Sequence, residues 1–310
     1  MNELKERIIK KINENKPKLN KKSVIAYSIM LAQIYKNVFK DIENPDLDNF
    51  YNYQDVLKYL ISKYEPSQRK TYLASLLAVA PEVKEYSKNM IDDIKIYNDI
   101  QNNQEYNDKE LKNILTKDEI NEKVEFYKQI FIKNIHKDPS ELSVKLIQDI
   151  QNYVLLCCCT GIYIPVRRSI DWCDMMLVPD DESTDNYLDY ANDMFIFNKY
   201  KTSKTYKRQE VIIPKPLLKI LGDFVILSLL KTKHKYLFFD DIYKPLSNVK
   251  LNYRFNKIFN QRHISINQFR HLFISDKIGT GINGFSIKEL MEDSKNMGHS
   301  LQTHLLYAKK

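Results

Sequence analysis

Glycine is scarce in this chain: six glycines occur in 310 residues, and long stretches contain none. Because glycine is the usual residue wherever the backbone must turn sharply or take a positive φ, this scarcity favours helices joined by short connections. Apolar residues recur at helical spacing over 24–39, directly after Ser23, which is a suitable N-cap. The same pattern predicts further helices over 54–63, 68–80 and 82–98.

The polar segment 101–108 (QNNQEYND) has no apolar periodicity and is the expected linker between two domains. A chain of this length can form two domains, each with its own hydrophobic core. We therefore expect a helical domain over residues 1–105 and a second domain over 106–310. Near the start of the second domain, Thr116 followed by Glu119 predicts a helix that opens with a capping box.

A second helix of this domain is expected to start at Asp138-Pro139 and to run to Cys159, just before Thr160-Gly161. Two short apolar runs, 194–197 and 211–213, then flank a polar turn with five cationic residues, which predicts a β-hairpin with a basic tip. Helices are expected again over 215–230, 246–259, 266–279 and 286–295, with a last turn from Leu301. The expected fold class is therefore mainly α with a small β-hairpin or sheet.

Charge is distributed unevenly along the chain. Residues 201–310 carry 20 Lys and Arg against 8 Asp and Glu, a net of +12, whereas residues 1–200 carry 28 against 32, a net of −4. A basic C-terminal third suggests a polyanionic partner such as nucleic acid, and a solvated basic surface is the alternative.

Several other classes of protein do not fit the sequence. No apolar run approaches the roughly 18 residues that a membrane span needs, and the charged N-terminus has no signal-peptide core. The four cysteines, three of them consecutive at 157–159, suit small buried residues in a reducing compartment, so an intracellular location is expected. The acidic run 179–189 lacks the glycine of a calcium loop and is expected to be a solvated connection.

Four patches of the second domain carry charged or nucleophilic side chains in a fixed order. They are CTGIYIPVRRSIDWCDM, the hairpin tip with its Lys-Thr pair, NQFRH, and MGHSLQTHLLY. The candidate site residues in these patches are, in chain order, Arg168, Lys201, Asn267, Arg270, His299 and Tyr307.

Together these patches resemble the catalytic signature of tyrosine recombinases, over residues 157–310. Arg168 has the spacing to Asp171 and Met175 that the family shows, whereas Arg167 does not. The resemblance implies an N-terminal helical DNA-clamp domain followed by a tyrosine-recombinase catalytic domain. The double arginine, and a composition rich in Lys, Asn, Ile and Tyr, are also similar to recombinases of large DNA viruses and their parasites.

The chemistry of these residue types fits phosphodiester transesterification. Arg168 and Arg270 are expected to bind the non-bridging oxygens of the scissile phosphate, because guanidinium groups stay protonated and donate in a fork. Tyr307 is expected to attack the phosphate and hold the DNA as a 3′-phosphotyrosine. Lys201 is the expected general acid for the leaving 5′-oxygen, with Lys204 as an alternative. His299 is expected to donate a hydrogen bond to the phosphate and to position the tyrosine.

The chain departs from the family pattern in two places. Asn267 stands where the family usually has a basic residue, and an asparagine cannot accept a proton near neutral pH. Removal of the proton from Tyr307 would then fall to water, His271, His299 or His304. Many relatives in the family that this chain resembles continue after the tyrosine with a helix that docks on a neighbouring protomer. Only three residues follow Tyr307, so that helix is expected to be absent, shortened or removed.

The expected partner is double-stranded DNA, with self-association to a tetramer on paired sites and no role for a membrane. No metal and no small-molecule cofactor are expected, because two arginines and a lysine can supply the charge that metal ions supply elsewhere. A type IB DNA topoisomerase and a catalytically inactive DNA-binding relative are the alternatives. The sequence leaves open whether integration, excision or resolution results, and whether cleavage occurs in cis or in trans.

Overall fold

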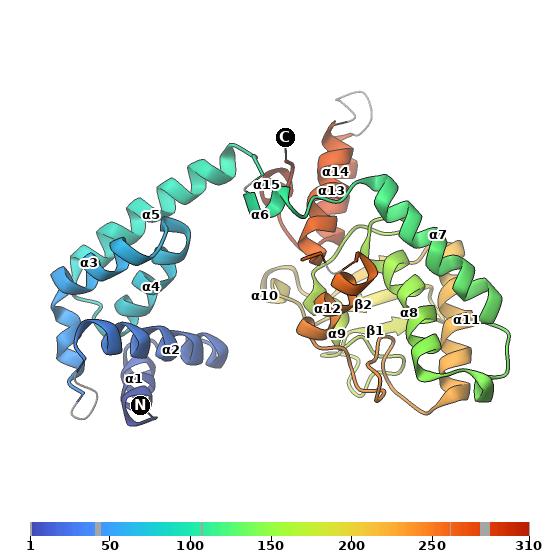
Figure 1. Cartoon of the computed structure of the whole chain (residues 1–310), viewed down its shortest axis with the longest axis horizontal. Helices are drawn as coiled ribbons and strands as arrows, with labels where there is room; N and C mark the ends of the chain where they lie inside the picture. Colours follow the sequence, from blue (N-terminus) through green and yellow to red (C-terminus); the bar gives the residue numbers. More distant parts are fainter. Residues whose placement is uncertain (1, 41–44, 107, 261, 280–285, 310) are drawn as a thin grey trace. The chain divides into compact units, whose positions relative to one another are not determined.

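The computed structural model describes residues 2–40, 45–106, 108–260, 262–279 and 286–309. These residues divide into two compact units, Met1–Asn103 and Gln104–Lys310, and each unit has its own hydrophobic core (Figure 1). In the described parts of the chain, no helix is long and apolar enough to cross a membrane.

The first unit is helical. Its helix α1 is charged along most of its length, yet Leu4, Ile8 and Ile12 recur every four residues and are completely buried, or nearly so. The elements of this unit are α1 (Asn2–Asn15), α2 (Lys21–Val38), the 3₁₀ helix η1 (Leu47–Tyr51), α3 (Tyr53–Lys63), α4 (Pro66–Val79) and α5 (Lys84–Asn102).

The second unit surrounds a small sheet with helices (Figure 1). Its elements before the sheet are α6 (Asp108–Leu111), α7 (Lys117–Asn134), the 3₁₀ helix η2 (Pro139–Glu141), α8 (Val144–Cys159) and α9 (Ser169–Cys173). The sheet region comprises β1 (Tyr187–Asp189), β2 (Met194–Phe197), α10 (Ser203–Tyr206) and β3 (Gln209–Ile212). The chain continues through α11 (Lys215–Lys231), α12 (Asn248–Ile258), α13 (Ile266–Gly279), α14 (Ile287–Asn296) and α15 (Leu301–Leu306).

The three strands form an antiparallel sheet in the order β1-β2-β3. Phe195 on the central strand lies opposite Leu188 on one side and Val211 on the other. Trp172 of α9 packs edge-on against Phe195, with ring centroids 5.1 Å apart, and is completely buried. The sheet therefore shares one core with the short helix that follows the double arginine.

The predicted fold class, mainly helical with a small sheet, is confirmed. The capping box of α7 is also confirmed: the Glu119 amide donates to Thr116 Oγ1 at 3.1 Å, and the Thr116 amide donates to Glu119 Oε2 at 2.8 Å. The two predicted hairpin strands form as β2 and β3.

Two local predictions were wrong, and two were incomplete. The N-cap of α2 is Asn20 rather than Ser23, because the Asn20 side chain accepts a hydrogen bond from the Ser23 amide at 2.8 Å. The helix expected from Asp138 is two elements, since Asp138 caps η2 and Ser143 then caps α8. The acidic run ends in β1, where Leu188 is buried, and the hairpin tip contains a short helix, α10.

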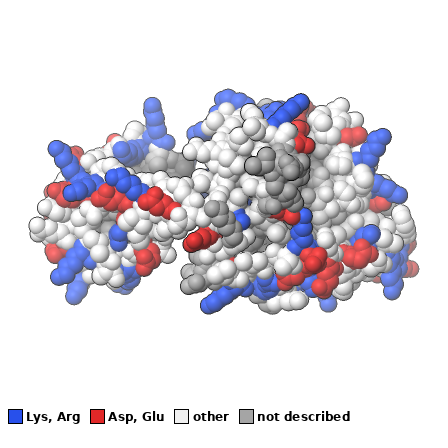
Figure 2. Space-filling view, turned by 90° about the horizontal axis from the view of Figure 1, so that it is seen from above, with Lys and Arg blue, Asp and Glu red and all other residues white. Residues whose placement is uncertain are grey.

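Cations and carboxylates are interspersed on the face that Figure 2 shows, and large areas carry neither. The coloured part of that face shows no single large cationic patch.

Replacing Thr116 by alanine should lower the free energy of unfolding of the second unit by about 1 kcal/mol, because the α7 amides lose their side-chain acceptor. Urea unfolding followed by the fluorescence of Trp172, the single tryptophan, measures this change. Thr116→Ser keeps the acceptor and should unfold as the wild type does. Equal destabilisation in both variants would show that the cap is not responsible.

Candidate active site

A tight turn after α8 positions the segment that carries Arg167 and Arg168. Helix α8 ends at Thr160, and Gly161 follows with φ +89°, a conformation that side chains strongly disfavour. A Cβ at Gly161 would also lie 2.5 Å from Cδ2 of Phe273 on α13. The turn is thus held close to the helix that carries Arg270.

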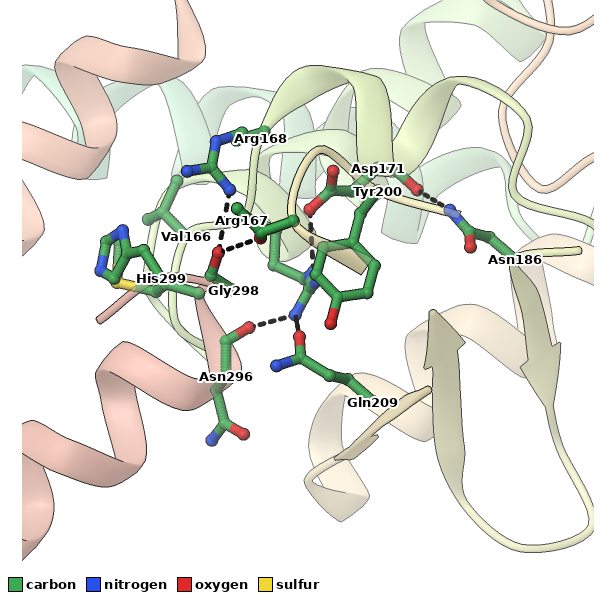
Figure 3. A network of polar contacts seen from close by, with 12 residues as sticks. Val166, Arg167, Arg168, Asp171, Asn186, Tyr200, Gln209, Asn296, Gly298 and His299 are labelled. Carbon is green, nitrogen blue, oxygen red and sulfur yellow. Dashed lines mark hydrogen bonds and ion pairs between the residues drawn. The ribbon is translucent and has the colours of Figure 1, made fainter. Parts of the chain in front are cut away.

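Arg167 is completely buried at the centre of a polar network (Figure 3). Its Nε donates to Asp171 Oδ2 at 3.1 Å, and its Nη1 donates to Gln209 Oε1 at 2.9 Å and to the Asn296 carbonyl. The guanidinium also lies over the Phe197 ring, 3.9 Å from its centroid. One side chain therefore connects α9, the sheet and the end of α14.

Burial has the largest effect on the pKa values of Arg167 and Asp171. It raises the pKa of Asp171 and lowers that of Arg167, and the opposite charge of each partner offsets part of the other's shift. The sequence assigned no role to Arg167, because the family spacing fits Arg168. The signal that was available is the Arg-to-Asp spacing of four residues, which is one helical turn.

Arg168, in contrast, is only half-buried and contacts the glycine-histidine-serine segment. Its Nη1 donates to the Gly298 carbonyl at 3.1 Å (Figure 3). The same carbonyl accepts a hydrogen bond of 2.6 Å from Thr202 Oγ1, next to Lys201 at the hairpin tip. Gly298 itself has φ +68°, and a Cβ there would lie 3.3 Å from Arg167 Nη2. Three of the four sequence patches therefore meet at this residue.

Arg270 brings in the remaining patch. It is completely buried on α13, where its Nη1 donates to the Val166 carbonyl at 2.9 Å and its Nη2 donates to His299 Nδ1 at 2.7 Å. Its Cζ lies 4.8 Å from the centroid of the Tyr307 ring. Burial lowers the pKa of Arg270 to about 10, and the neighbouring Tyr307 opposes that change.

Two histidine rings lie against the ring of Tyr307, and a third contacts one of them. The His299 ring stacks on the tyrosine ring at 5.5 Å, and its Nε2 lies 3.0 Å from His304 Nδ1. His271 Nδ1 donates to the backbone carbonyl of Tyr307 at 2.7 Å. The tyrosine is half-buried, and the Arg270 side chain lies against its ring.

Two predicted residues lie apart from this cluster. Lys201 is exposed at the hairpin tip, and Asn267 is exposed on α13, one turn before Arg270. Within the described part of the chain, neither side chain forms a hydrogen bond or an ion pair with the cluster. The same residues contain no group of three or more His, Cys, Asp or Glu side chains placed to hold a metal ion.

Comparison with models of protein families and with curated proteins finds no match. Solved structures do match. The Tn1549 transposon integrase, in complex with a circular intermediate DNA, superposes with a TM-score of 0.54 at 13% identity, over 98% of this chain and 94% of that one. The XerH site-specific recombinase, bound to a palindromic difH substrate, superposes with a TM-score of 0.51 at 15% identity, over 92% and 75%. This chain has the tyrosine-recombinase fold.

On this fold, Arg168, Arg270, His299 and Tyr307 lie together as neighbours, although they come from segments up to 139 residues apart. His304 is a buried member of the cluster that the sequence offered only as one of several proton acceptors. Its position five residues after His299, across the cap of α15, explains how the two rings meet.

Replacing Arg167 by methionine should lower the free energy of unfolding of the second unit by about 3–5 kcal/mol, because Asp171 is left buried without its partner. Urea unfolding followed by Trp172 fluorescence is again the measurement. Arg168→Met is the matched control, and it should cost far less because Arg168 is half-buried. Equal costs for the two variants would contradict the central position of Arg167.

Acid should destabilise the second unit through its buried histidines. Burial, reinforced by Arg270, lowers the pKa of His299 to about 2 and that of His304 to about 4, from 6.5. Between pH 6.5 and about 4 the unfolded chain therefore binds more protons than the folded one, so stability decreases as the pH falls. Urea unfolding at a series of pH values should show a shallower loss for His304→Asn than for the wild type. The exposed His263 is the control, and His263→Asn should leave the slope unchanged.

Proposed function

We propose that this protein cleaves and rejoins duplex DNA through a 3′-phosphotyrosine on Tyr307, as a site-specific recombinase or integrase. The observation that carries the proposal is the meeting of Arg168, Arg270 and His299 around Tyr307 on a tyrosine-recombinase fold. Two guanidiniums beside a phenol supply both the nucleophile and the positive charge that a phosphodiester transesterification needs.

The two arginines would bind the scissile phosphate in different ways. Arg168 is half-buried, with one nitrogen on the Gly298 carbonyl, so the rest of its fork is open to a ligand. Arg270 is held from two sides, by the Val166 carbonyl and by His299, and its buried Nε has no hydrogen-bond partner among the described residues. A phosphate oxygen would satisfy such an unpaired donor.

The proton that the leaving 5′-oxygen needs is supplied if Lys201 acts as the general acid. Tyr307 attacks the phosphorus, the bond to the 5′-oxygen breaks, and that oxygen takes a proton from the Lys201 ammonium. Attack by a 5′-hydroxyl reverses the step and releases the tyrosine, so the energy of the phosphodiester is conserved. Lys201 is exposed beside Thr202, which anchors the hairpin tip to Gly298, and Lys204 lies on the same tip.

The hydrogen bonds of the histidine rings limit which group can accept the proton of Tyr307. His271 donates through Nδ1 to a carbonyl, so its Nε2 is left with a lone pair, and its ring lies 4.8 Å from that of Tyr307. His299 is bonded at both nitrogens. We therefore assign proton removal to His271 or to water, with Asn267 limited to donating a hydrogen bond.

Double-stranded DNA is the proposed partner, and the XerH and Tn1549 proteins are in complex with a difH substrate and with a circular intermediate DNA. Residues 106–310 would supply catalysis, residues 1–105 would grip the DNA, and assembly to a tetramer would pair two sites. Phosphate contacts should make binding fall steeply with salt. An origin in a virus or another mobile element stays a prediction, as does an intracellular location.

Covalent capture tests the proposal. The protein is mixed, in EDTA, with DNA from the termini of its source element, nicked near candidate sites, beside Tyr307→Phe. A protein–DNA band that resists denaturation is expected in the wild type alone.

The other outcomes have defined meanings. Binding without any band in the wild type would contradict the enzyme and favour an inactive DNA binder. A band that persists in Tyr307→Phe would assign the nucleophile to another residue. Relaxation of supercoiled plasmid that lacks a special site would indicate a type IB topoisomerase instead.

A further inference from the structure

His304 is a buried titratable side chain that the proposed chemistry does not use. It lies on α15 with no exposed surface, and its Nδ1 is 3.0 Å from His299 Nε2. The two rings are 5.2 Å apart and nearly perpendicular, at 72°. His299 in turn contacts both Arg270 and the Tyr307 ring. His304 therefore reaches the reacting groups through one intermediate side chain.

The hydrogens in this chain of contacts follow from which groups can donate and which can accept. Arginine has only donors, so His299 Nδ1 must accept from Arg270 and carry no hydrogen. Burial and Arg270 keep His299 neutral, so its single ring hydrogen is on Nε2 and is donated to His304 Nδ1. The hydrogen of a neutral His304 must then be on its own Nε2.

That last hydrogen is unfavourable for stability. His304 Nε2 is buried and has no hydrogen-bond partner among the described residues, which costs about 1–3 kcal/mol. A leucine of similar size would fill the same space without this cost. The stability of the fold therefore does not account for a histidine at position 304, whereas the acceptor that it offers to His299 does.

We propose that His304 is a positioning residue: it accepts the Nε2 hydrogen of His299, and so holds the His299 lone pair toward Arg270 and Arg270 against Tyr307. This inference rests on the proposed function. It also revises the expected role of His299, because an Nε2 hydrogen donated to His304 is not available to a phosphate at the same time. In this arrangement His299 acts by orienting Arg270.

The first test compares two replacements of His304. Asparagine places Oδ1 where histidine has Nδ1, the same number of bonds from the backbone, and keeps the acceptor, whereas leucine removes it. With saturating nicked DNA, His304→Leu should form the covalent adduct about tenfold more slowly, and His304→Asn should stay close to the wild-type rate. DNA affinity should be unchanged in both variants. Leu305→Ala, an exposed change on the same helix, is the control and should react as the wild type does.

The second test reads the hydrogen positions directly. The chain has six histidines, so selective ¹⁵N labelling gives a tractable set of ring signals, and His304→Asn identifies the His304 pair by its loss. In the free protein at pH 7, His299 should carry its hydrogen on Nε2, both in the wild type and in His304→Asn. A hydrogen on His299 Nδ1, or on both nitrogens, would overturn the inference whether or not the protein cuts DNA.

The outcomes separate this inference from the proposed function. A wild-type protein without any adduct contradicts the function, and the ring hydrogens then decide the histidine pair alone. An active wild type with an equally fast or faster His304→Leu overturns the positioning role and leaves the function standing. If His304→Leu does not fold, the rate of adduct formation by His304→Asn tests the positioning role. A folded His304→Asn that forms the adduct as slowly as Tyr307→Phe also overturns that role.

Discussion

The buried guanidinium of Arg167 is the interaction on which the second unit depends. It bonds to α9, to β3 and to the last turn of α14, where its most distant partner, Asn296, lies 129 residues further along the chain. A buried ion pair is costly to desolvate, and further hydrogen bonds to the arginine offset part of that cost. Gln209 and the Asn296 carbonyl supply those bonds on the arginine side. The adjacent Arg168 is thereby held at a defined angle, half-buried and directed to Gly298.

Much of this fold could be predicted from the sequence, because N-cap residues and apolar periodicity mark its helices. The capping box at Thr116 and Glu119, and the strands on either side of the basic tip, follow from local chemistry alone. The failures have local causes as well. Asp138 and Ser143 are both good N-caps, and periodicity across 138–159 could not show that each caps a separate element. Strand β1 was hidden because an acidic run precedes its buried Tyr187 and Leu188.

The site was less accessible to sequence reasoning than the fold. Order along the chain identified Arg168, Arg270, His299 and Tyr307 as candidates, and these four lie together. Which nitrogen each histidine offers, however, follows only from three-dimensional contacts, because the tautomer of one ring is set by the partner of another. The contacts of Arg167 and of His304 could not be predicted for the same reason: their partners are remote in sequence or lie on a turn between two helices.

The carbonyl oxygen of Gly298 joins two segments of the second unit. It is a single acceptor with two donors, Arg168 from the segment before α9 and Thr202 from the hairpin tip. Any displacement that lifts the tip away frees one lone pair of that oxygen and strengthens the hold on the arginine that remains. A displacement of the tip that breaks the Thr202 bond therefore changes the hydrogen bond that Arg168 donates. Two segments that are 34 residues apart in the sequence are therefore coupled through one backbone oxygen, in addition to the packing of their side chains.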